Sequence, residues 1–139
     1  MSTLPDRSTT HPVHAVALAG TLPLFLGALL SDWAYASTEH VQWANFAQWL
    51  LAGGLVFAAI PLVLALVRLV ARRESATPSV MYLLVLLAMW VIGFINSLVH
   101  ARDAWAVMPT GPLLSAIVLV LSLVAIWLCF ARTRVGGGR

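Results

Sequence analysis

The sequence predicts an all-α integral membrane protein in which four membrane-spanning helices form one bundle. Of its 139 residues, 61% are hydrophobic and 9% are charged, whereas soluble domains carry about 45–50% apolar and about 25% charged residues. The apolar residues gather in four long runs, and a helix needs about 20 such residues to cross a bilayer. This composition excludes a water-soluble domain, a disordered tail and a nucleic-acid-binding arm, and the length leaves no room for a second domain.

The four apolar runs and the polar residues that end them define the expected spans. We expect helices over residues 13–35, 43–70, 79–100 and 112–131, since a membrane helix satisfies its own backbone polar groups. They make up a membrane domain over residues 11–132, with a polar segment over 1–10 before it and a flexible Gly-rich tail over 133–139 after it. Polar or charged clusters close the four runs at Asp32, Arg72-Arg73-Glu74, His100-Ala101-Arg102-Asp103, and Arg132 with Arg134.

Prolines mark both the starts and the interiors of these helices. Pro12, Pro78 and Pro112 stand at or near first helical positions, where the missing N–H leaves no hydrogen bond unmade. Pro23 and Pro61 lie inside the first two spans. They are expected to kink their helices, which membrane helices tolerate when neighbouring groups compensate.

The charges divide unequally between the two sides of the predicted bundle. Four spans place both termini on one side, which carries seven arginines and two carboxylates, a net charge of +5. The other side carries Arg102 and three carboxylates, a net charge of −2. Since cytoplasmic loops hold the arginine excess, both termini are expected on the cytoplasmic side. The overall charge of +3 therefore reflects orientation, and no nucleic acid partner is expected.

The outer side of the bundle gathers the residues most suited to chemistry. Asn96, His100 and Asp103 lie on one stripe of the third span because they are four and three residues apart. Asp32 ends the first span on the same side. We expect these four residues to form a quinone or other cofactor site, a proton relay, or a polar network that only docks the two helices. Their place at a helix end, where charge costs less than at the midplane, favours docking. The uncharged midplane argues against an ion pump.

On the inner side, His11 and His14 are three residues apart and share a face if both are helical. This pair is a candidate metal site, with Glu74 and Cys129 as the only other ligands available there. Metal sites usually need a third or fourth ligand, so an interfacial helix start is the favoured interpretation. Because Cys129 is the only cysteine, an internal disulfide is excluded.

A haem b held by two histidines within one chain requires two ligands at the same depth. His14 begins the first span and His100 ends the third, so they lie near opposite membrane faces, roughly 30 Å apart. The remaining ligand sets are His14 with a non-histidine ligand, His40 with His100, or ligands shared across a homo-oligomer. Ser115 and Ser122, seven residues apart, are expected to hydrogen-bond along one face of the fourth span.

Several motifs resemble those of a widespread bacterial family of small four-span membrane proteins, classed as a domain of unknown function. The resemblance covers roughly His11 to Arg132. Many members also carry Trp-x-His early in the third span, where this chain has Ser79-Val80-Met81-Tyr82, so no role of that histidine is carried over. The matching motifs are His11-Pro12-Val13-His14, Leu22-Pro23, Asp32, Gln42-Trp43-x-Asn45-Phe46, Trp49-Leu50-x-Ala52-Gly53-Gly54-Leu55, Asn96-x-x-x-His100-Ala101-Arg102-Asp103-Ala104-Trp105 and Pro109-x-Gly111.

The resemblance implies a location in the bacterial inner membrane and redox work at its outer face. Relatives are fused to Rieske iron–sulfur modules or neighbour quinoprotein (PQQ) sorbosone-type dehydrogenases. The leading hypothesis is therefore a redox accessory or membrane anchor that couples a periplasmic dehydrogenase to quinone, with haem b as a candidate cofactor. The alternative is a structural or assembly scaffold without a cofactor. A metal-handling role for His11 and His14 ranks last.

Overall fold

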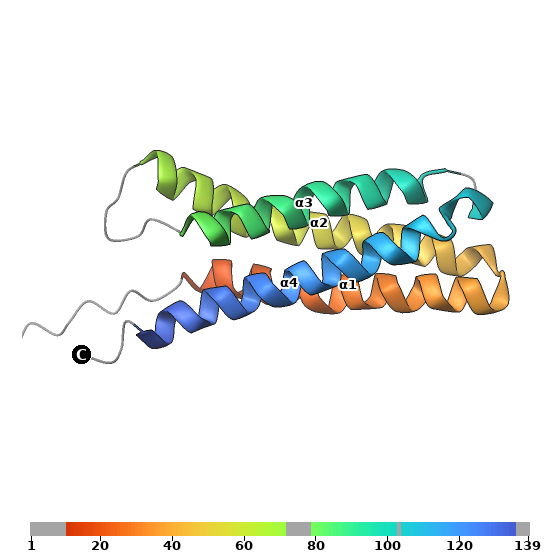
Figure 1. The fold of residues 1–139 in the computed structure, drawn as a ribbon, viewed down its shortest axis with the longest axis horizontal. Helices are drawn as coiled ribbons and strands as arrows, with labels where there is room; N and C mark the ends of the chain where they lie inside the picture. The colour runs from red at the N-terminus through yellow and green to blue at the C-terminus, as the bar shows by residue number, and fades with distance from the viewer. Residues whose placement is uncertain (1–10, 72–78, 103, 136–139) are drawn as a thin grey trace, which may run out of the picture.

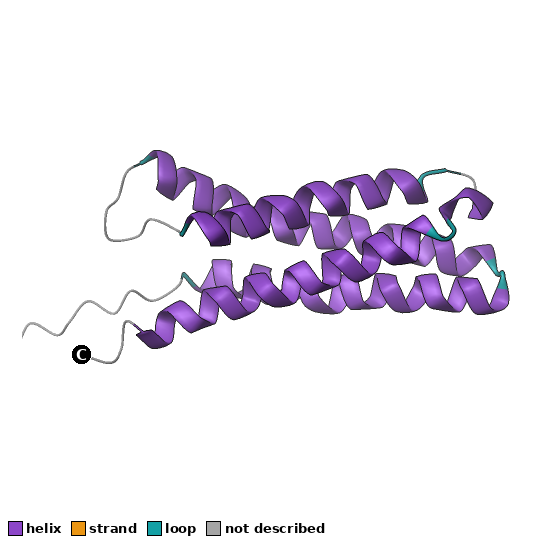
Figure 2. Cartoon of the chain, in the orientation of Figure 1, coloured by secondary structure: helices purple, strands orange, loops and turns teal. Residues whose placement is uncertain are grey.

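The computed structural model describes residues 11–71, 79–102 and 104–135. These residues form four long helices, with a short 3-10 helix before the last one (Figure 2). Each long helix is apolar and long enough to cross a membrane, so the prediction of an all-α four-helix membrane bundle is confirmed. The elements are α1 (Pro12–Thr38), α2 (Val41–Val70), α3 (Val80–His100), η2 (Ala104–Val107) and α4 (Thr110–Val135).

The four helices lie side by side along one long axis (Figure 1). Helices α1 and α3 each pack against both α2 and α4, so α1 and α3 occupy diagonally opposite positions in the bundle. The start of α1 and the end of α4 lie at the same end (Figure 1), which we call the terminal end. The opposite end, where α1 and α3 finish and α2 and α4 begin, is the distal end.

The buried residues of α1 and α3 follow one register. Each buried residue of α3 stands 68 positions after a buried residue of α1. The two diagonal helices therefore face the bundle axis in equivalent ways, and residues at equivalent levels can meet across it. The matching sets are His14, Leu18, Thr21, Phe25, Ala28 and Asp32 on α1, and Tyr82, Leu86, Met89, Gly93, Asn96 and His100 on α3.

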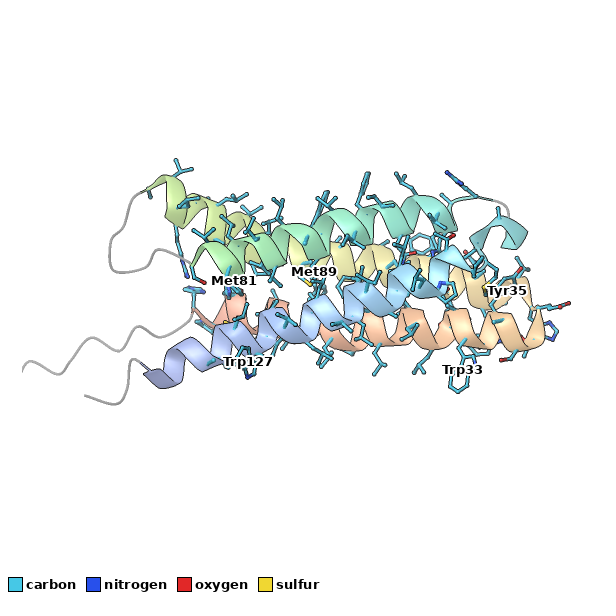
Figure 3. The ribbon with its side chains drawn as sticks, in the orientation of Figure 1. Trp33, Tyr35, Met81, Met89 and Trp127 are labelled. Atoms are coloured by element: carbon cyan, nitrogen blue, oxygen red, sulfur yellow. The ribbon has the colours of Figure 1, made fainter. Side chains whose placement is uncertain are left out.

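Large apolar side chains cover the outside of the bundle as well as its core. Met89 lies among the helices, whereas Trp33 and Trp127 project away from them (Figure 3) and are 69% and 68% exposed. In a bilayer this outer surface faces lipid tails, so burial of apolar surface does not drive one helix against another. Close packing and hydrogen bonds between helices must then hold the bundle together.

The closest packing between α1 and α2 depends on a glycine. A Cβ atom at Gly54 would stand 2.3 Å from a ring carbon of Phe25, which is fully buried. The absent side chain lets the Phe25 ring lie directly on the α2 backbone. Both helices continue through their internal prolines, Pro23 and Pro61.

Candidate functional site

A buried carboxylate and a buried imidazole meet at the distal end. Asp32 lies near the end of α1, and His100 is the last residue of α3. The His100 Nε2 and Asp32 Oδ1 atoms are 2.7 Å apart, and the two side chains are 0% and 1% exposed. The bond therefore joins the two diagonal helices across the bundle axis and lies out of reach of solvent.

Ser115 on α4 and Asn96 on α3 extend this pair into a four-residue group, which we call the distal network. Ser115 Oγ is 2.5 Å from Asp32 Oδ2 and 2.9 Å from the side-chain amide of Asn96. The second ring nitrogen of His100 is 2.9 Å from the backbone oxygen of Asn96. A Cβ at Gly111 would lie 3.0 Å from the His100 ring, so this glycine lets α4 begin close beside it.

The distal network admits a charged arrangement of protons. In it, Asn96 Nδ2 donates to Ser115 Oγ, and Ser115 donates to an ionised Asp32. A protonated His100 then donates from Nε2 to Asp32 and from Nδ1 to the Asn96 backbone oxygen. Both oxygens of the carboxylate accept a bond, which a buried charge requires.

A neutral arrangement keeps the same contacts. A protonated Asp32 donates from Oδ1 to an unprotonated His100 Nε2, and His100 Nδ1–H donates to the Asn96 backbone oxygen. Ser115 donates to the other carboxyl oxygen and accepts from Asn96 Nδ2. The two arrangements hold the same number of protons and differ in whether Asp32 or His100 carries one of them.

A second polar contact joins the same two helices at the terminal end. His14 Nε2 is 2.7 Å from the Tyr82 hydroxyl, and His14 is 2% exposed. Asp32 follows His14 by 18 residues, and His100 follows Tyr82 by the same 18 residues. Eighteen residues are five helical turns, or about 27 Å. The two contacts therefore lie on the same faces of α1 and α3, near opposite ends of the spans.

A hydroxyl pair lies between these two levels. Thr21 Oγ1 on α1 is 2.7 Å from Ser122 Oγ on α4, and it donates to the Leu18 backbone oxygen at 2.7 Å. Both side chains are fully buried. This pair ties α1 to α4 in the apolar part of the bundle, where each hydroxyl needs a partner.

The structure brings together Asp32, Asn96 and His100, three of the four residues expected at the outer end of the bundle. Asp103, the fourth, lies outside the described residues. His14 lies at the terminal end, so it is about 27 Å from the level of His100 along the helices. With this separation, His14 and His100 do not fit the axial positions of one haem within a single chain.

The two inner histidines have different surroundings. His11 is exposed and caps α1, because its Nδ1 accepts from the Val13 N–H at 3.4 Å. His14 is buried against Tyr82. Within the described ranges, no three histidine, cysteine or acidic side chains stand close enough together to hold a metal ion. The proposed partner Glu74 lies outside those ranges.

Ser115 and Tyr82 belong to these contacts although the sequence did not single them out as site residues. The two serines of α4 were expected to bond along their own helix, but Ser115 bonds to Asp32 and Ser122 to Thr21 on α1. The signal was present, since serines seven residues apart in an apolar span mark one helical face. The sequence does not show which helix packs against this face.

Fold and site together define a multi-span membrane protein with polar contacts buried at both ends of its bundle. Residues 10–138 match the family described as predicted membrane protein (DUF2231). The chain belongs to this family, as the resemblance in the sequence indicated. Comparisons with curated proteins and with solved structures give no match.

Proposed function

We propose that this protein is a structural membrane protein, an anchor or assembly scaffold whose distal network locks the bundle. The observation that supports this is the closure of the network on itself. Asp32, Asn96, His100 and Ser115 bond to one another, and the Asp32 and His100 side chains are at most 1% exposed. A site that exchanges a ligand needs access to these groups, whereas a lock needs them sealed.

The proposal is tested with wild type and His100→Ala purified in detergent. We expect the substitution to make the bundle easier to unfold, because it leaves Asp32 without its bond across the axis. Neither protein should bind a short-chain ubiquinone analogue in a saturable way, and neither should show a haem Soret band. The scaffold proposal would be contradicted if wild type bound the quinone in a saturable way and His100→Ala weakened this binding without unfolding the protein.

The second candidate is a redox accessory that couples a periplasmic PQQ- or Rieske-type protein to quinone. The observation that favours it is the pair of proton arrangements in the distal network, since a group that passes one proton between a carboxyl and an imidazole suits quinol oxidation. The quinone titration above separates the two candidates. Quinone binding by wild type with loss in His100→Ala would support this one.

We also propose a bacterial inner-membrane location, which the family resemblance implies, and both termini in the cytoplasm, which the arginine distribution supports. Single cysteines test the orientation in a Cys129→Ser background. Ser37→Cys at the distal end and Ala71→Cys at the terminal end both replace exposed residues. A membrane-impermeant maleimide added to spheroplasts should label the first, and should label the second only after permeabilisation. The reverse pattern would invert the proposed orientation.

A further inference from the structure

A groove of about 260 Å³ lies at the distal end, between the start of α2 and the end of α3. His100 belongs both to the groove lining and to the distal network, and its side chain is 0% exposed. The lining is polar for a surface beside a membrane span. The lining residues are Val41, Gln42, Ala44, Asn45, Gln48, His100 and Arg102.

The lining suits a negatively charged group that accepts hydrogen bonds. Gln42, Asn45 and Gln48 fall every third residue on α2 and offer amide N–H donors. Arg102 supplies a cation, and among the residues that the structure describes the lining includes no carboxylate. Arginine offers planar paired donors that match phosphate oxygens.

The start of α2 adds to the positive charge that faces the groove. The N-cap residue His40 makes no side-chain capping bond, and the first turn of α2 carries no acidic residue. The first N–H groups of a helix lack partners within the helix and present a partial positive charge. Val41 and Gln42 belong to this turn and line the groove, so the backbone and Arg102 favour the same charge.

The surroundings point to a lipid as the source of that anion. The groove lies at the end of two spans, the level at which a bilayer places its headgroups. On α2 beside it, Trp43 and Phe46 are 40% and 49% exposed and their rings contact each other. Exposed aromatic rings at a span end sit at the headgroup level and pack against lipid chains.

We infer that this groove binds the phosphodiester headgroup of an anionic phospholipid in the leaflet at the distal end. Arg102 pairs with the phosphate, while the amides of Asn45 and Gln48 hold its oxygens. The acyl chains lie along the apolar surface of α2. A lipid held there would bridge α2 and α3 beside the distal network.

The test is native mass spectrometry of the detergent-purified full chain with added phosphatidylglycerol or phosphatidylcholine. Arg102→Gln is the test variant. Glu39→Gln is its matched control, because it also removes one charge at the distal end but lies outside the groove lining. Loss of one arginine near anionic lipid costs about 1 kcal/mol, so Arg102→Gln should weaken phosphatidylglycerol binding about fivefold. Glu39→Gln should leave it unreduced.

Three outcomes would overturn the assignment. The first is equal binding of the two lipids that Arg102→Gln leaves unchanged. The second is displacement of phosphatidylglycerol by inorganic phosphate at equal concentration, since this would make a free anion the ligand. The third is a bound short-chain quinone that excludes phosphatidylglycerol, which would assign the groove to redox work. Circular dichroism of both variants checks that each retains its helices.

Discussion

Replacing Asp32 in two ways separates the charged arrangement of the distal network from the neutral one. Asp32→Ala removes both carboxyl oxygens, which lie 2.7 Å from His100 Nε2 and 2.5 Å from Ser115 Oγ. Asp32→Asn keeps one oxygen and puts an NH₂ in place of the other. In the neutral arrangement this amide reproduces a protonated Asp32, because its N–H donates to His100 Nε2 and its oxygen accepts from Ser115.

The expected losses of unfolding free energy follow from the number of hydrogen bonds that each substitution removes. A hydrogen bond between membrane helices contributes about 0.6 kcal/mol on average and about 1.7 at most, so the two bonds lost in Asp32→Ala should lower the unfolding free energy by about 1–3.5 kcal/mol. Asp32→Asn should cost less than about 0.6 kcal/mol if the network is neutral. If it is charged, the substitution leaves a buried cation without its partner, a loss of about 3–5 kcal/mol.

We expect the neutral arrangement, because it buries no charge. The assay is equilibrium unfolding in mixed micelles with increasing dodecyl sulfate, followed by helical circular dichroism. Ser37→Ala is the control, since Ser37 is exposed and donates only within α1, to Trp33 O. A cost for Asp32→Asn as large as that for Asp32→Ala would refute the neutral arrangement. A cost for Asp32→Ala no larger than that of the control would refute the structural role of the network.

Two further substitutions test the packing and the terminal end by the same assay. Gly54→Ala places a Cβ 2.3 Å from the fully buried Phe25 ring, and the overpacking should lower the unfolding free energy by about 1–3 kcal/mol. Gly53→Ala is the control and should be tolerated, because its Cβ would meet its nearest atom at 3.7 Å. Equal effects of the two substitutions would show that the fit at Phe25 is loose. Tyr82→Phe removes the hydroxyl 2.7 Å from His14 and should cost about 0.6–1.7 kcal/mol; an unchanged unfolding curve would mean that this bond adds no stability.

The fold was predictable because its signals are local. The four apolar runs and the polar residues that end them locate the helices without any knowledge of how these helices pack. The meeting of Asp32 with His100 was predictable for a related reason. Both residues end a span on the same side, and a buried polar group at a helix end needs a partner.

The remaining contacts depend on which helices are diagonal in the bundle, and this is not a local property. Asp32 has its second partner on α4, so Ser115 could be assigned only once α1 was known to pack against α4. No pattern in the sequence marks Tyr82 as the partner of His14. The role of Tyr82 follows from the offset of 68 residues that it shares with the Asp32–His100 pair.

The five-turn spacing between the two diagonal contacts has a consequence for the bilayer around the protein. The contacts are about 27 Å apart along the helices, close to the thickness of a hydrocarbon core of about 30 Å. Sliding α1 along α3 would break both contacts at once, so the bundle does not lengthen easily to match a thicker membrane. Tilting or local thinning of the lipid must absorb the difference. The protein should therefore resist unfolding best in bilayers whose hydrocarbon thickness matches its spans, and its resistance to unfolding should fall in bilayers thicker than that.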